Sequence, residues 1–239
     1  MDIKIISCLK DNYSYLIIDN TNNTACVVDP SESKPIIDFV EQKNINLQYI
    51  LITHHHFDHI GGNKELKNRY GSKIVGFKDD AHRIPGIDIL VEDNQIWKEK
   101  NFQAQIFHIP GHTSGHICFY FYEEGFLFSG DTLFSLGCGR IFEGSYEDMF
   151  NSLKKIKNLP KNTKIYCGHE YTYQNSKFCL EYDSKNLRLR NKINEIKEKI
   201  TNNLPTVPTL LEDEITCNIF LKAEDLKTFK KLRDLKDNF

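Results

Sequence analysis

The chain reads Thr53-His54-His55-His56-Phe57-Asp58-His59 directly after residues 49–52, a short apolar run. Such a run predicts a buried strand, and Gly61-Gly62 just beyond it predicts a turn. Side chains two apart on an extended chain point to the same side, so we expect His54, His56 and Asp58 to share one face. The pattern is typical of a strand end that presents several ligands to a metal ion.

Three later fragments repeat this arrangement, in which a strand-like run ends in glycine and then in a side chain that can bind a metal. They are Pro110-Gly111-His112, Gly130-Asp131 and Gly168-His169. The repetition predicts that several strand ends converge on one rim. His55, His82 and His108 are interpreted as surface or packing residues, and His116 as a residue beside the site instead of a ligand.

The number of ligands predicts two metal ions. One ion would be held by His54, His56 and His112. The other would be held by Asp58, His59 and His169. Asp131 could bridge the two ions together with a water or hydroxide. Catalytic zinc usually takes three protein ligands and keeps one position open, and paired ions share a hydroxide nucleophile.

The order of these motifs resembles that of the metallo-β-lactamase-like hydrolases. Four further segments are similar to the glyoxalase II family, also called hydroxyacylglutathione hydrolases: residues 11–17, 130–140, 167–172 and 218–239. The resemblance spans essentially the whole chain.

The resemblance implies an α/β (α+β) fold: a four-layered αββα sandwich over residues 1–170, followed by a small C-terminal helical domain over residues 171–239. It implies a thioesterase that hydrolyses S-D-lactoylglutathione to glutathione and D-lactate, the second step of methylglyoxal detoxification. It also implies two divalent metal ions per chain. Zinc is the expected metal, with iron or manganese as alternatives. Asp58 is then both a ligand and the candidate to orient the metal-bound hydroxide.

The substrate-binding positions of the family fall on Arg140, Phe142, Tyr171, Arg233 and Lys236. The family commonly has tyrosine where this chain has Phe142, so one hydroxyl contact is missing. Ile219 and Lys222 likewise replace the Pro and Arg of the family's tail. Glutathione carries two carboxylates, and a predicted helix puts Arg233 and Lys236, three residues apart, on one face. The alternative interpretation is that this pair is only the solvated face of the helix.

Two other functions stay open. One is another enzyme of the superfamily, a lactonase or an iron-dependent persulfide dioxygenase. The other is a non-catalytic metal-binding protein that kept the fold, although a degenerate copy would be expected to have lost ligands.

The composition limits the class of protein. The chain has 239 residues and a formal net charge of −2, which gives no general affinity for nucleic acid. No apolar run is long enough to cross a bilayer, and the first residues resemble no signal peptide. Seven scattered cysteines predict reduced, mostly buried thiols of a cytoplasmic protein. We expect a monomer that binds a small-molecule glutathione thioester.

The apolar pattern predicts mixed α/β layers. Strands are expected near residues 2–8, 13–19, 24–29, 49–53, 73–77, 102–108, 116–122, 126–129 and 164–167. Helices are expected near residues 33–43, 63–69, 146–157, 172–182, 185–201 and 223–236. After His169 the pattern becomes helical, so we place a boundary near residue 170.

Overall fold

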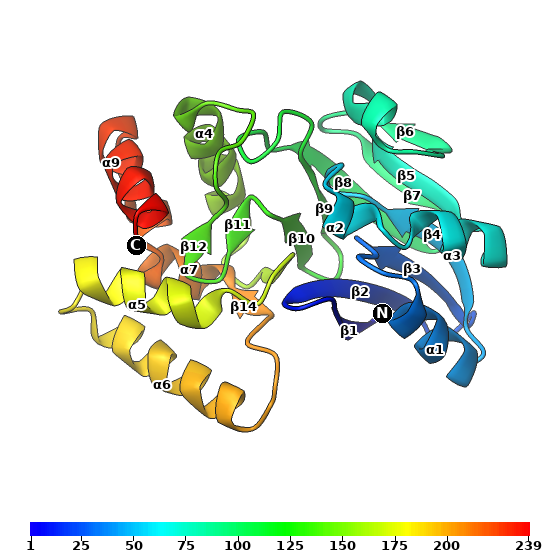
Figure 1. The fold of residues 1–239 in the computed structure, drawn as a ribbon, viewed down its shortest axis with the longest axis horizontal. Coiled ribbons are helices and arrows are strands. Elements are labelled where there is room, and N and C mark those ends of the chain that lie inside the picture. Colours follow the sequence, from blue (N-terminus) through cyan, green and yellow to red (C-terminus); the bar gives the residue numbers. More distant parts are fainter. The chain divides into compact units, whose positions relative to one another are not determined.

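The computed structural model describes all residues, 1–239, and divides them into two compact units (Figure 1). Unit 1 comprises Met1–His108 and Gly115–Glu124, and unit 2 comprises Ile109–Ser114 and Gly125–Phe239. Each unit is described by itself. The domain boundary expected near residue 170 rests on a change in the sequence pattern, whereas the two units are defined by compactness. The boundary remains a prediction.

Unit 1 contains a six-stranded sheet whose strands follow chain order. They are β1 (Asp2–Cys8), β2 (Asn12–Asp19), β3 (Thr24–Val28), β4 (Asn46–Leu51), β5 (Lys73–Phe77) and β6 (Ile89–Val91). β1, β2 and β3 pair antiparallel, whereas β3 to β6 pair parallel. The parallel strands all end at the same edge of the sheet, and β4 delivers the histidine-rich segment there.

Helices cover one face of this sheet. They are α1 (Lys34–Gln42), α2 (Phe57–Ile60), α3 (Asn63–Tyr70) and the 3₁₀ helix η1 (Lys78–Arg83). α1 begins with Pro35 in its first turn, where its missing N–H costs nothing. Its apolar side chains Ile36, Ile37 and Val40 join a core with β-strand residues such as Leu16. Burying this face holds the sheet rigid at the edge where the ligands lie.

A second group of strands in unit 1 packs on the opposite face. It is formed by β7 (Ile96–Glu99), β8 (Phe102–His108) and β9 (Ile117–Phe121), which pair antiparallel. Tyr49 of β4 meets the Trp97 ring edge-on at 5.4 Å and also contacts Phe102. Its hydroxyl donates to Glu99 at 3.1 Å. Unit 1 therefore contains helix, sheet and sheet layers.

Unit 2 contains three paired strands, a small hairpin and six helices. The strands are β10 (Phe126–Gly130), β13 (Lys164–Cys167) and β14 (Thr209–Leu210), and the hairpin is β11 (Leu133–Phe134) with β12 (Gly137–Cys138). The helices are α4 (Tyr146–Lys157), α5 (Thr172–Tyr182), α6 (Leu187–Thr201), α7 (Leu211–Cys217), α8 (Ile219–Lys222) and α9 (Leu226–Asp237). Phe178, Phe220 and Phe229 form an aromatic core among α5, α8 and α9.

Besides shifts of one or two residues at the ends of several expected elements, three differences from the sequence-based expectation are clear. The strand expected over residues 49–53 runs over Asn46–Leu51, because the Asp29 carboxylate, not a neighbouring strand, accepts the N–H of Thr53. The extended segment ends at His56, so Asp58 lies on α2 and not on one extended face with His54. The last helix begins only at Leu226, where Asp225 caps it by accepting the N–H of Thr228 at 2.8 Å.

All seven cysteines are free and buried, as expected. None of the helices has the length and the apolar character needed to cross a membrane.

Candidate metal centre

The histidine-rich segment of unit 1 is held between the end of β4 and the short helix α2. His54 and His59 are buried, whereas His56 and Asp58 are partly accessible. His54 Nε2 lies 3.1 Å from His56 Nδ1, and the His54 and His59 rings are 4.1 Å apart. Several nitrogen donors of the predicted set are therefore gathered within one small volume.

Asp29, which follows β3, orients this cluster. Its Oδ2 accepts hydrogen bonds from Thr53 Oγ1 at 2.6 Å and from His59 Nδ1 at 3.0 Å. A carboxylate accepts but cannot donate, so the His59 proton is on Nδ1 and Nε2 carries the lone pair. Fixing the tautomer in this way is what carboxylates do behind metal-binding histidines.

The same carboxylate reaches His54 through Thr53. The Thr53 hydroxyl donates its proton to Asp29, so its oxygen accepts from His54 Nδ1 at 3.0 Å. The lone pair of His54 is then also on Nε2. Donor atoms of Asp29, His54 and His59 lie within 4.8 Å of one another. Because Asp29 already accepts three hydrogen bonds, we interpret it as the residue that orients His54 and His59, and not as a ligand.

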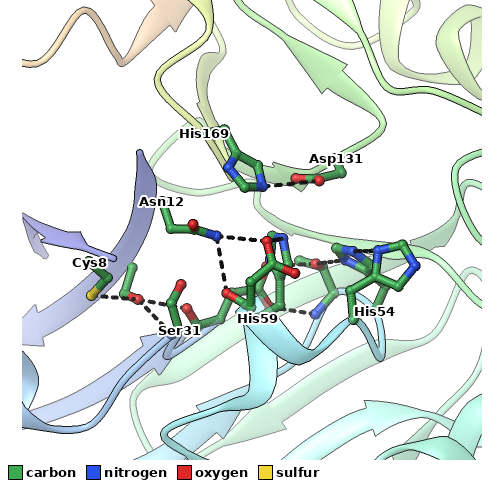
Figure 2. Close-up of polar contacts among 12 residues, drawn as sticks. Cys8, Asn12, Ser31, His54, His59, Asp131 and His169 are labelled. Atoms are coloured by element: carbon green, nitrogen blue, oxygen red, sulfur yellow. Dashed lines mark hydrogen bonds and ion pairs between the residues drawn. The ribbon is translucent and has the colours of Figure 1, made fainter. Parts of the chain in front are cut away.

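Asn12 fixes the position of Asp58. Its side-chain amide donates to the Asp58 backbone oxygen at 3.1 Å and to Asp58 Oδ2 at 3.0 Å (Figure 2). Asp58 Oδ2 lies 3.7 Å from His59 Nε2. The carboxylate is thus held beside the Nε2 lone pair of His59.

Of the two other histidines nearby, only His116 packs on His54. The ring of His116 is fully buried and stacks on His54, with centroids 4.6 Å apart. His55 points elsewhere, and its Nδ1 lies 3.2 Å from the buried carboxylate of Asp80.

In unit 2, two neighbouring parallel strands deliver the next pair of predicted ligands. Asp131 follows β10 and His169 follows β13, and Gly130 is in register with Cys167. Parallel neighbours end at the same edge, so His169 Nε2 comes within 3.3 Å of Asp131 Oδ2 (Figure 2).

His112 approaches the same carboxylate. Its Nδ1 donates to the backbone oxygen of Arg140 at 2.8 Å, which leaves the lone pair on Nε2. That lone pair faces Asp131 Oδ2 at 3.5 Å. Two acceptors in this arrangement repel each other unless a cation, a proton or a metal ion, lies between them. The donor set of unit 2 therefore fits a metal.

Gly139 allows the backbone of the loop after β12 to pass close to Asp131 and His112. A Cβ at this position would come 2.0 Å from the Asp131 backbone oxygen and 3.1 Å from His112 Nδ1. Glycine is required here because the backbone approaches Asp131 and His112 directly.

Three of the predicted substrate-binding residues form a cationic cluster in unit 2. Arg233 is only 3% exposed; it donates to the Cys138 backbone oxygen and to Asp237, each at 2.8 Å. Arg140 is exposed, and its Nε lies 3.6 Å from the same Asp237 carboxylate. Burial lowers the pKa of Lys236, and the nearby charges of Arg233 and Arg140 lower it further. Arg140 and Arg233 share the single Asp237 carboxylate, so the cluster of three cations has an excess of positive charge.

The other two predicted substrate-binding residues lie against metal-binding candidates. Phe142 is 63% exposed and meets the His112 ring edge-on at 5.1 Å. Tyr171 is 38% exposed and stacks on His169, with centroids 4.7 Å apart.

Sequence reasoning did not identify Asp29, and it noted Asn12 only within the family-similar segment 11–17, without a role. Asp29 follows a strand just as Asp131 does, so the strand-end pattern could have found it. Asn12 lies 46 residues from Asp58, and no local pattern connects them.

Comparison with known proteins gives consistent results. Residues 10–169 match the family model of the metallo-β-lactamase superfamily, and residues 170–239 match that of the hydroxyacylglutathione hydrolase C-terminus. The hydroxyacylglutathione hydrolase of Pelagibacter ubique is 64% identical over 239 residues, all of both chains. That of Methylococcus capsulatus is 38% identical, covering all of this chain and 99% of the relative.

Among solved structures, ETHE1 from Myxococcus xanthus is similar, with a TM-score of 0.75 at 21% identity, over 98% of this chain and 90% of that one. At this identity the likeness concerns the fold alone. Together the matches confirm the expected fold class, a metallo-β-lactamase fold with a C-terminal helical region.

Proposed function

We propose a reaction for this chain from one premise: the chain belongs to the hydroxyacylglutathione hydrolase family of the metallo-β-lactamase superfamily and is a hydrolase. The proposed substrates are S-(2-hydroxyacyl)glutathione thioesters, S-D-lactoylglutathione foremost. The products are glutathione and a 2-hydroxy acid, D-lactate in that case, as in the second step of methylglyoxal detoxification. The full-length identity of 64% to a relative of that name carries the proposal.

We propose that seven side chains hold two metal ions. His54, His56 and His112 would bind one ion, Asp58, His59 and His169 the other, and Asp131 would bridge them. The fixed tautomers of His54, His59 and His112 support this assignment. When bound, the pair of ions would supply an activated water and polarise the thioester carbonyl. Zinc is the proposed metal, with iron or manganese as alternatives.

The chain's own contribution to the chemical step is positioning. Asp58, held by Asn12, can accept a proton or hydrogen bond from the attacking water and so direct its lone pair at the carbonyl carbon. The departing glutathione thiolate has a pKa near 8.5 and leaves without a strong acid. No general acid is therefore needed to protonate the leaving group, and none is among the assigned residues.

Substrate binding is proposed for Arg140, Phe142, Tyr171, Arg233 and Lys236. The cationic cluster suits the carboxylates of glutathione, because charge-assisted hydrogen bonds are strong where the surroundings are partly dry. The exposed rings of Phe142 and Tyr171 lie beside His112 and His169, so they can contact the part of the substrate nearest the thioester.

The test is a hydrolysis assay with purified protein on lactoylglutathione, a lactone and a β-lactam. Hydrolysis of the thioester well above the other two supports the proposal. Faster opening of the lactone would favour a lactonase. Oxygen uptake with glutathione persulfide and one iron per chain would favour a persulfide dioxygenase. A monomeric state and a cytoplasmic location are also proposed, and sedimentation and cell fractionation test them.

A further inference from the structure

The hairpin of β11 and β12 is a buried segment whose polar backbone is satisfied by side chains. It begins two residues after Asp131 and ends two residues before Arg140, whose backbone oxygen fixes His112. All residues from 133 to 138 are buried, so water cannot satisfy the turn. Buried N–H and C=O groups must then find partners within the protein.

Those partners come from the C-terminal helical region. Asn175 on α5 donates to the Ser135 backbone oxygen at 3.1 Å. Asn218 donates to the backbone oxygens of Gly137 at 3.0 Å and Phe134 at 3.4 Å. These hydrogen bonds go to backbone oxygens, so they do not depend on the side chains of the turn.

Glu214 on α7 is the centre of this arrangement and is fully buried. Its Oε2 accepts from the Leu136 N–H at 2.8 Å and from Asn218 Nδ2 at 3.0 Å. Its Oε1 accepts from the hydroxyls of Thr209 at 2.8 Å and Ser135 at 3.3 Å.

Glu214 has a carboxyl group in surroundings that disfavour its charged form. Burial raises the pKa of its carboxyl, and the hydrogen bonds from Leu136, Thr209 and Asn218 oppose that effect. No cationic side chain forms an ion pair with it. A buried carboxylate without an ion pair is costly unless its oxygens are fully hydrogen-bonded. Leu136 also has a left-handed backbone, with φ of 58°, and its N–H is the one that Glu214 holds.

We propose that Glu214 is a positioning residue that, through the hairpin turn, keeps Asp131 and the Arg140 carbonyl in place for metal binding and hydrolysis. The inference deepens the proposed function and rests on it. It assigns the C-terminal region a second task besides substrate binding: shaping the segment that carries Asp131 to Arg140.

The test compares Glu214→Ala with Asp213→Ala, its neighbour on α7. Asp213 is also a buried carboxylate, but its hydrogen-bond partners are Arg188 and Lys192 on α6 and not groups of the turn. Both changes are expected to lower Tm. At a temperature where both variants are folded, E214A is expected to lose metal to a chromogenic chelator at least about tenfold faster than wild type, with kcat reduced similarly. D213A is expected to keep both values.

Glu214→Gln serves as the conservative variant. Its amide oxygen can face Leu136 and Asn218, and its NH₂ can face the two hydroxyls, which can accept instead of donate. E214Q is therefore expected to stay within about threefold of wild type in metal release and kcat. A Gln variant as defective as the Ala variant would overturn the hydrogen-bonding role, as would E214A behaving like D213A.

Asn175→Ala keeps the inference testable if E214A does not fold, since it removes a single contact to Ser135. It is expected to speed metal release and lower kcat in the same direction, and wild-type values would overturn the inference. If wild-type protein bound metal but did not hydrolyse lactoylglutathione, the proposed function would fail. The rate of metal loss to the chelator would still test the positioning role of Glu214.

Discussion

The Asp29 carboxylate accepts a hydrogen bond from His59 Nδ1 at 3.0 Å, and the Thr53 hydroxyl extends the same anchor to His54. His54 and His59 are assigned to different metal ions. One buried carboxylate therefore orients a ligand of each ion, and a defect at Asp29 should affect both ions together.

We expect Asp29→Asn to weaken metal binding by roughly 10- to 100-fold. The new NH₂ group would face His59 Nδ1 and favour the tautomer whose proton blocks Nε2. Competition with a chromogenic chelator measures the affinity. Asp19→Asn is the matched control, because Asp19 is a buried carboxylate that binds Asn22 and Asn101 instead. Equal affinities for D29N and D19N would contradict the assignment.

Phe142→Tyr should lower KM by about fivefold if the new hydroxyl makes one hydrogen bond to substrate, since such a bond contributes ~1 kcal/mol. Phe142 is 63% exposed, so Tm should not change. Steady-state kinetics with lactoylglutathione measures the effect. An unchanged KM would mean that this ring does not reach a polar group of the substrate.

Lys236→Ala should raise KM roughly tenfold and leave kcat nearly unchanged, because contacts to the glutathione carboxylates are the same in the ground and transition states. Lys231→Ala, an exposed lysine on the same helix, is the control. Arg233→Ala should raise KM and also lower Tm, since its guanidinium holds the Cys138 backbone oxygen. A loss confined to kcat in K236A would contradict substrate binding.

The pH profile should report Lys236. Its pKa is lowered by burial and by neighbouring cations, so its charge is lost at a lower pH than for an ordinary lysine. Binding of an anionic substrate therefore weakens as pH rises through that lowered pKa, and kcat/KM falls. In Lys236→Arg the charge persists, so this alkaline fall should move upward. A K236R profile identical to wild type would exclude Lys236 as the group that titrates.

Asp131→Ala should leave little activity and reduce metal content, because its Oδ2 lies within 3.5 Å of both His112 and His169. Metal analysis and kinetics on the same preparation measure the two effects. A near-normal rate would remove Asp131 from the bridging position. Asp148→Ala, which removes the capping box of α4, is a suitable control for stability.

Elements with strong local signals could be predicted from sequence. The helix expected over residues 146–157 has both of those ends in the structure, because its apolar residues recur at helical spacing. The capping box of Ser145 and Asp148 fixes its first turn. The strands β11, β12 and β14 have two residues each, too few to show the alternating hydrophobic pattern from which a strand is predicted. The turn between β11 and β12 is held by distant side chains such as Glu214, and β14 forms by pairing with β13.

The ligand-capable residues could be chosen from sequence because strand ends and glycines mark them. The residues that orient them could not. Asn12 acts on Asp58 across 46 residues, and the Arg140 carbonyl acts on His112 across 28. The latter contact uses only the backbone oxygen of Arg140, so the residue type at position 140 does not reveal it. The burial of Arg233 could not be predicted either, because the amphipathic pattern of a helix does not show which of its cationic side chains will be covered by neighbouring elements.

Elemental analysis of freshly isolated, active protein tests the binuclear centre most directly. The account predicts two transition-metal ions per chain, with thioester hydrolysis falling in proportion as a chelator removes them. Full activity in protein that contains no bound transition metal would contradict it.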